Sequence, residues 1–438
     1  MEFPKNFSRS KDVEKKVKRK NFYSRSEECK LDAYLDPNNS EVFENTQGAS
    51  VTIQGIMRVN STTAKDLFCM VRGEMFMKAF SEQMGSFKDG ENDPSLAMEV
   101  LILRYLSYFK TYRISPCVQQ YYMDFTCSKS PETEMGDLET QIYGEYKKLR
   151  KKKYIYSELM DKEPRIRYVM SEFIDGPSVE EHLPHFEEKD FQHILFQVFY
   201  TADQFHRAGV KHNDIHTKNV LVRPIAPQDL HFVTSQGIVV LEGCRYLVKI
   251  IDYDLSYFYE KAEWNLDGKT YKTDDDMCQD LGVCRVGDNP KFDQVTFLTY
   301  LILHLKKQKL DSFFIERFCS KVSSEPKDML QDLVSKYKSG WPGRLCHNLD
   351  FIPNLPEGDE KNRGVCNNWV PSDELFRPFS YMIENNLFEL KTLPFTPKMV
   401  GSLPMERAWV SLEINDKAYE ELRELRSPKG KKTLTPSA

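Results

Sequence analysis

The most informative part of this 438-residue chain is Gly209-Val210-Lys211-His212-Asn213-Asp214-Ile215-His216-Thr217-Lys218-Asn219-Val220-Leu221-Val222. The stretch predicts a sharp turn rich in polar side chains, followed by a short apolar strand. Asp214 and Asn219 would lie in one loop, because Gly209 predicts the end of a preceding buried helix. Together they offer a carboxylate that can accept a proton from a hydroxyl and an amide oxygen that can hold a cation. The preceding helix is predicted from the helical spacing of Ile194, Leu195, Val198, Phe199, Ala202, Phe205 and His206.

A second chemically distinctive stretch comes later in the chain, at Asp252-Tyr253-Asp254-Leu255-Ser256. It directly follows Tyr246-Leu247-Val248-Lys249-Ile250-Ile251, whose composition predicts an apolar strand. A carboxylate at the end of a buried strand is energetically costly unless a cation or hydrogen-bond donors receive it. We therefore expect Asp252 to have such a partner.

The two stretches together resemble the catalytic loop H-R-D-x-x-x-x-N and the D-F-G motif of protein kinases, in the same order along the chain. The resemblance implies that Asp214 is the catalytic base and that Asn219 and Asp252 bind Mg²⁺ against the phosphates of ATP. Either stretch alone could be a connection between elements with incidental polar residues. Two motifs in the expected order favour the kinase-like interpretation.

Two charged residues nearer the N-terminus extend the resemblance. Glu74-Met75-Phe76-Met77-Lys78-Ala79-Phe80 is a predicted strand similar to the V-A-I-K strand of kinases, which implies that Lys78 binds the α- and β-phosphates. A helix is predicted from Pro94 to Leu106, and Glu99 lies among its apolar residues. The resemblance implies a Lys78–Glu99 ion pair. The alternative for Lys78 is an exposed lysine on a strand.

The nucleotide-binding loop matches less well than the catalytic motifs. Thr46-Gln47-Gly48-Ala49-Ser50-Val51 occupies the place of a glycine-rich loop, and a turn made of the small residues Gly48, Ala49 and Ser50 would cover the phosphates there. Arg167 to Gly176 resembles the hinge between kinase lobes. By this resemblance, the backbones of Glu172 and Ile174 would contact the adenine of ATP.

The region after the catalytic loop also has a kinase-like order. Strands are predicted at 238–241 and 246–251, paired as a hairpin around Gly243, and 256–289 occupies the place of an activation segment. A buried helix is predicted from Phe292, with Asp293 in its first turn. The resemblance implies that Asp293 braces the backbone of the catalytic loop. The alternative is a favourable anion at a helix N-terminus.

The composition excludes several other classes of protein. The net charge of −5 gives no reason to expect nucleic-acid binding, and no apolar run reaches the roughly 18 residues of a membrane span. The N-terminus lacks the apolar core of a signal peptide. Ten cysteines occur without a C-x-x-C pair, which indicates reduced thiols. We expect a monomer in the cytoplasm or nucleus.

The resemblance implies an α+β, two-lobed protein kinase-like fold, with a β-rich small lobe that carries one main helix and a mostly helical large lobe. We expect a flexible basic extension over 1–45, because lysines crowd there, and a small lobe over 46–173. The polar segment at about 128–164 is predicted as an insertion in the small lobe. The large lobe would span 174–400, and 401–438 would be a C-terminal tail with a disordered end.

Several motifs depart from those of ordinary protein kinases, and these departures indicate one branch of the protein kinase-like superfamily. Asn213 replaces the arginine of H-R-D, His216 stands two residues after the base, and no A-P-E triplet precedes Asp293. Together with D-Y-x-L-S at Asp252, these features resemble haspin, an atypical Ser/Thr protein kinase. The resemblance implies a serine or threonine hydroxyl of a protein as acceptor. The extensions would suit a kinase of a large DNA virus, acting in an infected host cell.

Two other functions are open at this point. The residues around Asp214 and Asp252 also resemble choline kinases and aminoglycoside phosphotransferases, which phosphorylate small alcohols, and Asp254 supplies the second carboxylate of that pattern. A non-catalytic pseudokinase scaffold is the third possibility. The weak glycine loop supports it, but the chain has every charged residue that catalysis would need.

Overall fold

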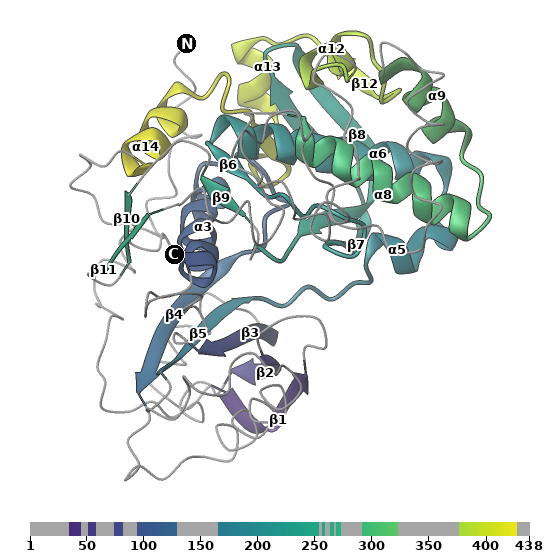
Figure 1. Cartoon of the computed structure of the whole chain (residues 1–438). Helices are drawn as coiled ribbons and strands as arrows, with labels where there is room; N and C mark the ends of the chain where they lie inside the picture. Colours follow the sequence, from purple (N-terminus) through teal and green to yellow (C-terminus); the bar gives the residue numbers. More distant parts are fainter. Residues whose placement is uncertain are drawn as a thin grey trace, which may run out of the picture. The chain divides into compact units, whose positions relative to one another are not determined.

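The computed structural model describes residues 35–44, 51–57, 74–81, 94–128, 165–253, 256–258, 263–266, 269–272, 291–322 and 376–426. The fold is mixed α+β (Figure 1). The described residues fall into two compact units. Unit 1 contains 108–118 and everything described from 175 onward, and unit 2 contains the described residues up to 107 together with 119–174.

Unit 2 is built on a five-stranded antiparallel sheet in the order β1-β2-β3-β5-β4. Its elements are β1 (Leu35–Glu44), β2 (Val51–Met57), β3 (Glu74–Ser81), β4 (Tyr121–Ser128), β5 (Arg165–Glu172) and most of α3 (Pro94–Thr111). The predicted strand around Lys78 and the predicted helix around Glu99 are confirmed as β3 and α3. The prediction of a flexible extension is wrong for β1, because its backbone pairs with β2. Backbone pairing between segments leaves little trace in local composition.

Helix α3 is buried on nearly all sides. Val100, Leu101 and Ile102 are fully buried in succession, which is typical of a helix inside a core rather than on a surface. One charged residue of α3, Arg104, is also buried, and its guanidinium lies 2.6 Å from the carboxylate of Asp124 on β4. A buried charge of this kind is tolerated because its partner is equally buried.

Unit 1 contains the remaining helices among the described residues. They are α5 (Val179–His182), α6 (Glu188–Arg207), α8 (Phe292–Lys307), α9 (Phe313–Val322), α12 (Phe379–Glu384), α13 (Pro397–Ser402) and α14 (Asp416–Arg426), with short 3₁₀ turns at Leu183–His185 and Met405–Arg407. The helices predicted before Gly209 and from Phe292 are confirmed as α6 and α8. Gly209 has φ +74°, which allows the chain to leave α6 sharply.

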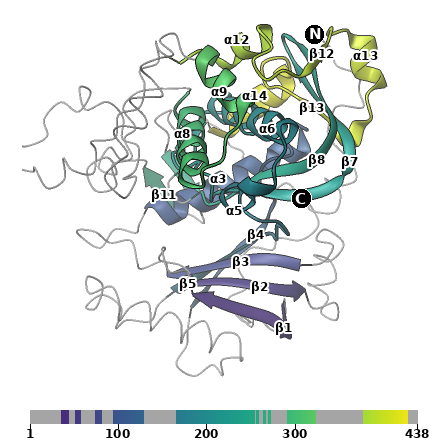
Figure 2. The same cartoon turned by 90° about the vertical axis from the view of Figure 1, so that its right-hand side faces the viewer.

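Two long strands connect the predicted catalytic loop to Asp252. They are β7 (Val220–Thr234) and β8 (Gly237–Ile250), and Figure 2 follows their course. They form the centre of a four-stranded sheet in the order β12-β8-β7-β13, with β12 at Lys391–Leu393 and β13 at Ala408–Val410. Smaller pairs join β6 (Val210–Lys211) to β9 (Tyr257–Phe258) and β10 (Glu263–Leu266) to β11 (Lys269–Lys272).

The predicted hairpin around Gly243 is wrong. Residues 237–250 are one strand, and its partner is β7, with the turn at Ser235 and Gln236. Gly243 has φ +59° and its N–H donates to Asp229 Oδ1 at 2.7 Å, so the glycine is accommodated as an irregularity within the strand. The register of β7 with β8 shifts in the same region. An isolated glycine in a strand pattern can mark such a bulge as well as a turn.

Residues 401–426, predicted as part of a tail, contribute β13 and α14 to unit 1. Among the described residues, no helix is long and apolar enough to span a bilayer. Several predictions concern segments outside the described residues: most of the basic extension, the glycine-rich loop, the insertion at about 128–164 and the end of the tail.

Candidate active site

Asp293 holds the backbone of the predicted catalytic loop. It lies in the first turn of α8 and is 5% exposed. Its Oδ2 accepts the N–H of His212 at 2.9 Å, and its Oδ1 accepts the N–H of Asn213 at 2.8 Å. Asn213 has φ +65°, a conformation that asparagine adopts more readily than most residues. The predicted bracing role of Asp293 is confirmed.

The side chain of Asp214 is partly exposed and is oriented by two neighbours. Asn219 Nδ2 donates to both the main-chain oxygen and Oδ2 of Asp214, at 3.1 Å in each case. His216 Nε2 lies 3.6 Å from the same Oδ2. The structure therefore places the side chain of Asn219 in hydrogen-bond contact with Asp214, the predicted base.

His216 faces Asp214 as a neutral ring. Its Nδ1 accepts the N–H groups of Lys218 and Asn219, at 3.2 and 3.3 Å, so the ring proton is on Nε2, toward Asp214. Burial lowers the pKa of His216 to about 4. At neutral pH the histidine thus orients the carboxylate without forming a charged pair.

A second histidine connects the loop to the strand that ends before Asp252. His212 is fully buried; its Nδ1 accepts the N–H of Asp214 at 3.3 Å, and its Nε2 donates to the carbonyl of Ile251 at 3.2 Å. Burial lowers the pKa of His212, which agrees with this neutral form. Its ring also lies 4.9 Å from that of Tyr253, whose hydroxyl donates to the Ile250 carbonyl at 2.9 Å. Tyr253 is thus fully buried with its hydroxyl group satisfied.

The two predicted metal ligands come close through their backbones. The N–H of Ile251 donates to the carbonyl of Asn219 at 3.0 Å, so Asp252 follows the point where the two segments join. Asp252 has φ +66° and is partly exposed. Because Asn219 Nδ2 is used by Asp214, its amide oxygen is the atom left for a cation. Carboxylate and amide oxygens suit Mg²⁺.

The predicted metal site would be incomplete as a set of protein ligands. Within the part of the chain that the structure describes, no three or more His, Cys, Asp or Glu residues form a metal-binding group. Mg²⁺ usually takes one or two carboxylates and completes its shell with water and substrate phosphates. The pair Asn219 and Asp252 fits that mode and does not fit a structural zinc site.

The other predicted site residues lie in unit 2. The backbone of Lys78 on β3 pairs with Thr52 and Val169, and its side chain is outside the described residues, as is Gly48. Glu99 is buried on α3, with 3% of its surface exposed. The Lys78–Glu99 pair therefore stays a prediction.

The predicted hinge is tied to the segment before β4. The N–H of Glu172 donates to the carbonyl of Gln120 at 2.7 Å, and the carbonyl of Glu172 accepts from Gln119 Nε2 at 3.1 Å. Ile174 is 6% exposed at the end of the predicted hinge.

Sequence reasoning missed how far α8 supports the loop. Tyr300 packs its ring against His216, with centroids 5.5 Å apart, and His304 Nε2 lies 3.2 Å from Glu180 Oε2 on α5. Asp293, Tyr300 and His304 are spaced by seven and four residues, which places them on one face of a helix. This spacing in the sequence could have indicated that all three side chains lie on the same face of α8.

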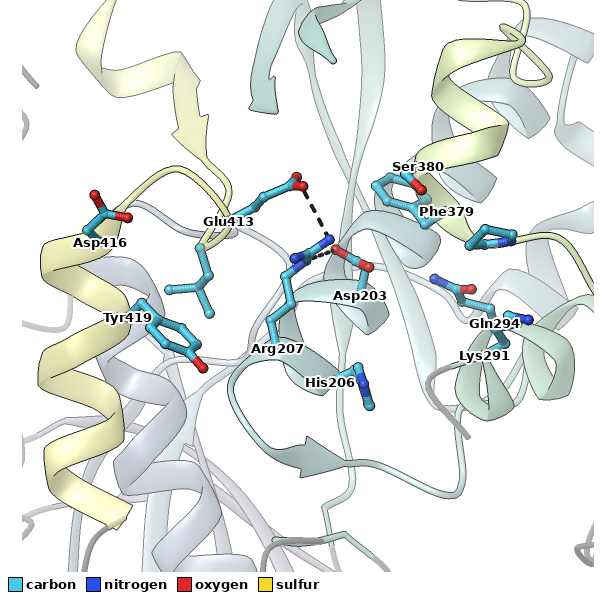
Figure 3. A pocket seen from close by; sticks show the side chains of 12 residues that line it. Asp203, His206, Arg207, Lys291, Gln294, Phe379, Ser380, Glu413, Asp416 and Tyr419 are labelled. Carbon is cyan, nitrogen blue, oxygen red and sulfur yellow. Dashed lines mark hydrogen bonds and ion pairs between the residues drawn. The ribbon is translucent and has the colours of Figure 1, made fainter. Parts of the chain in front are cut away.

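A separate cavity of about 610 Å³ lies in unit 1 (Figure 3), and none of the predicted site residues lines it. Its charged residues pair partly with one another: Arg207 Nε donates to Asp203 at 2.7 Å, and Arg207 Nη2 lies 3.8 Å from Glu413. The remaining lining residues are His206, Lys291, Gln294, Pro378, Phe379, Ser380, Leu412, Asp416 and Tyr419.

Comparisons with known proteins add little to this geometry. No protein-family model matches the chain, and no curated protein matches it. Among solved structures, the chain is similar to the Rad53 kinase domain and SCD2 in complex with AMPPNP, at 13% identity and a TM-score of 0.25. The match covers 51% of this chain and spans about half of the other chain, 54%. Likeness at this level carries no argument about fold or function, so both rest on the residues described above.

Proposed function

We propose that this chain is an ATP-dependent phosphotransferase with a two-lobed, protein kinase-like fold, which transfers the γ-phosphoryl group of Mg-ATP to a serine or threonine hydroxyl of a protein. One observation carries the proposal. A partly exposed carboxylate, Asp214, lies on a loop that the Asp293 carboxylate holds by two backbone N–H groups, and this loop is joined by hydrogen bonds to the segment that leads into Asp252.

Asp214 would accept the proton of the acceptor hydroxyl. Its Oδ2 is held by Asn219 and faced by the neutral ring of His216, so the carboxylate has a defined direction. Partial exposure leaves room for a hydroxyl to approach. In phosphoryl transfer, positioning of this kind contributes more than covalent chemistry by the protein.

Asn219 and Asp252 would hold Mg²⁺, which supplies neutralisation of the charge on the phosphates. Lys78, steadied by Glu99, would orient the α- and β-phosphates. Gly48 would cover them, and the backbones of Glu172 and Ile174 would contact the adenine. These assignments follow from the kinase resemblance of the motifs.

A haspin-like, atypical Ser/Thr kinase is the branch that the loop favours. The position of the usual loop arginine holds Asn213, whose backbone is already held by Asp293. The loop therefore has its internal support without a phosphate on the activation segment. We further propose an intracellular monomer, in the cytoplasm or nucleus, acting on a protein partner. Neither nucleic acid nor a membrane has a part in the proposed reaction.

The test is transfer of radiolabelled phosphate from ATP to three classes of acceptor: histone, a generic protein substrate, and small alcohols such as choline and an aminoglycoside. We expect the proteins to be labelled. Asp214→Asn should reduce the rate by about 10²- to 10⁴-fold, the usual contribution of a general base. Asp311→Asn, an exposed aspartate before α9, is the matched control and should behave as the parent.

Two results would change the assignment. Labelling of the small alcohols alone would replace the protein kinase by a small-molecule kinase. Mg-ATP binding without transfer to any acceptor would indicate a pseudokinase scaffold.

A further inference from the structure

The cavity of unit 1 lies where four segments that are distant in the sequence come together (Figure 3). Asp203 and Arg207 are near the end of α6, Gln294 is in the first turn of α8, and Phe379 begins α12. Side chains from the segment 412–419 complete the wall. All of these residues belong to unit 1, so the cavity forms within one compact unit. Its volume of about 610 Å³ is within the roughly 300–1,000 Å³ that is typical of small-molecule sites.

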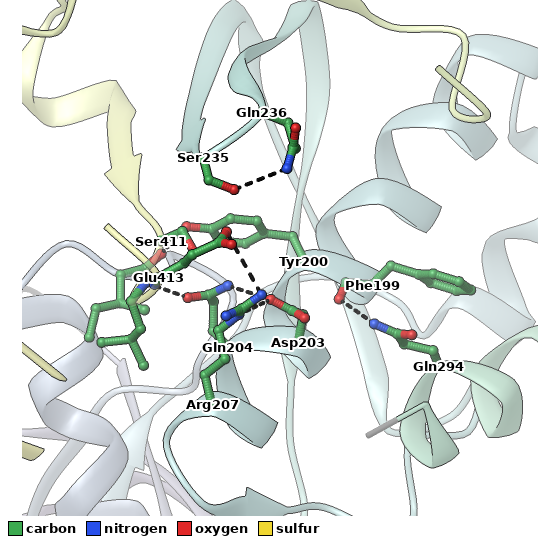
Figure 4. A network of polar contacts seen from close by, with 12 residues as sticks. Phe199, Tyr200, Asp203, Gln204, Arg207, Ser235, Gln236, Gln294, Ser411 and Glu413 are labelled. Carbon is green, nitrogen blue, oxygen red and sulfur yellow. Dashed lines mark hydrogen bonds and ion pairs between the residues drawn. The ribbon is translucent and has the colours of Figure 1, made fainter. Parts of the chain in front are cut away.

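Gln294 brings to this wall a buried acceptor that is not satisfied. The residue is 1% exposed, and its Nε2 donates to the carbonyl of Phe199 at 3.1 Å (Figure 4). This bond identifies the nitrogen end of the amide, because a carbonyl accepts only from a donor. The Oε1 of Gln294 has no hydrogen-bond partner in the part of the chain that the structure describes. Buried polar atoms without a partner are rare and costly, so this one favours a donor from outside the chain.

Asp203 adds an acceptor oxygen that carries charge. Its Oδ2 accepts from Arg207 Nε at 2.7 Å and from Gln204 Nε2 at 2.9 Å (Figure 4). Its Oδ1 receives no hydrogen bond from any described residue, and the side chain keeps 17% of its surface exposed. Burial raises the pKa of Asp203, as expected for a carboxylate with too few donors.

The charges on the wall favour a cation as ligand. Three carboxylates face two cationic side chains, and these residues are Asp203, Glu413, Asp416, Arg207 and Lys291. Arg207 is held between two of the carboxylates, with its Nη2 3.8 Å from Glu413 Oε2, so its charge is compensated inside the wall. An anionic ligand would meet an excess of carboxylates. An uncharged apolar ligand would leave the acceptor atoms of Gln294 and Asp203 unpaired.

Apolar side chains line another part of the cavity. Pro378, Phe379 and Leu412 contribute there, together with the ring of Tyr419. Tyr419 is 36% exposed and is one of two large hydrophobic side chains that are exposed among the described residues. Aromatic rings attract cations, and apolar walls suit the aliphatic part of an amine. The cavity therefore combines unpaired acceptors with surface for an apolar stem.

From these contacts we propose that the cavity is a second binding site, which takes an organic cation with an apolar stem. Its ammonium or guanidinium group would supply the donors that Asp203 Oδ1 and Gln294 Oε1 lack, and its stem would lie against Phe379 and Tyr419. A lysine or arginine side chain of a partner protein has this chemistry, and so has a free aliphatic amine. The proposal does not depend on phosphotransfer, because none of the predicted site residues lines the cavity.

The test measures the binding of three small probes to the full chain by ligand-observed NMR titration. The probes are Nα-acetyl-lysine methylamide, cadaverine and Nα-acetyl-norleucine methylamide, the last of which has the stem without the charge. We expect the lysine probe to bind at least about tenfold more tightly than the norleucine probe. Tighter binding of the lysine probe than of cadaverine would assign the site to a peptide, and the reverse order would assign it to a free amine. Equal binding of the lysine and norleucine probes, or no binding of any probe, would overturn the proposal.

Variants decide whether the lysine probe binds in this cavity. Asp203→Asn removes the charge, and Gln294→Met removes Oε1 while keeping a side chain of similar length; each should raise Kd about tenfold. Glu384→Gln is the matched control, since this exposed acid of α12 lies outside the cavity and loses the same charge. If circular dichroism shows that Asp203→Asn does not fold, Glu413→Gln replaces it, because that side chain is 32% exposed. A Kd equal to that of Glu384→Gln in the cavity variants would overturn the site.

Discussion

Replacement of Asp293 by asparagine would separate two explanations of an acidic residue at the start of α8. The carboxylate accepts one backbone N–H on each oxygen, from His212 and Asn213. An amide has one acceptor oxygen, and its nitrogen would face the second N–H donor to donor. If the residue were only a favourable anion at a helix N-terminus, the loss would be the dipole contribution alone.

The two explanations differ in magnitude. Loss of a partner that leaves a buried N–H unsatisfied costs about 1–3 kcal/mol. The dipole effect of an exposed acid in a first turn is worth about 0.3–1 kcal/mol. For a chain of 438 residues, a loss of about 2 kcal/mol lowers Tm by roughly 2 °C, because the unfolding entropy is about 2.1 cal/mol/K per residue. We expect Asp293→Asn to show a shift of that order.

Thermal and urea unfolding would measure the change, with Glu316→Gln as the matched control. Glu316 is an exposed acid in the first turn of α9, so its replacement reports the dipole contribution without a brace. Asp293→Asn should also lower phosphotransfer, since the loop that carries Asp214 loses one of its two hydrogen bonds to residue 293. Equal, small losses of stability in the two variants, with unchanged activity, would refute the bracing explanation.

Three further predictions follow from the described contacts. Asp252→Asn should fold but lose the thermal stabilisation by Mg-ATP. For the parent, this stabilisation should reach about 2.7 kcal/mol at a hundredfold excess of Mg-ATP over Kd. The same thermal shift in the variant and the parent would exclude Asp252 as a metal ligand. Phosphate on Thr270, Tyr271 or Thr273 should not be needed for phosphotransfer, because Asn213 carries no charge to receive it. Protein treated with phosphatase and checked by mass spectrometry should therefore keep its phosphotransfer rate. A tenfold drop in that rate, restored by rephosphorylation, would contradict this prediction. Burial lowers the pKa of His193 to about 4, so the unfolded chain takes up a proton from about pH 6.5 downward while the folded chain stays neutral, and stability falls as the pH falls in this window. In urea unfolding, His193→Gln should reduce the decrease in the free energy of unfolding between pH 7 and pH 5 by about 2 kcal/mol. An unaltered pH dependence of stability would show that His193 does not cause this decrease.

The sequence by itself determined the elements whose signals are local. Helix α6 was readable from apolar spacing ended by Gly209, and α8 from a similar run that begins beside Asp293. The polar loop between α6 and β7 was readable because chemically reactive residue types stood at fixed spacing between two apolar elements. Short-range patterns of this kind survive in a sequence because each residue interacts mainly with neighbours three or four positions away.

Only the tertiary structure decided what depends on distant partners. Gly243 lies within a strand instead of at a turn because β7 pairs along β8. Residues 408–426 belong to unit 1 because Ser411 and Leu412 find partners on β7 and α6, roughly 180 and 210 positions away (411 − 233 and 412 − 204). The neutral form of His216 also follows from burial and from backbone donors that no motif specifies. Such contacts form only once the chain has closed long loops, so the free energy that fixes them is absent from any local stretch of sequence.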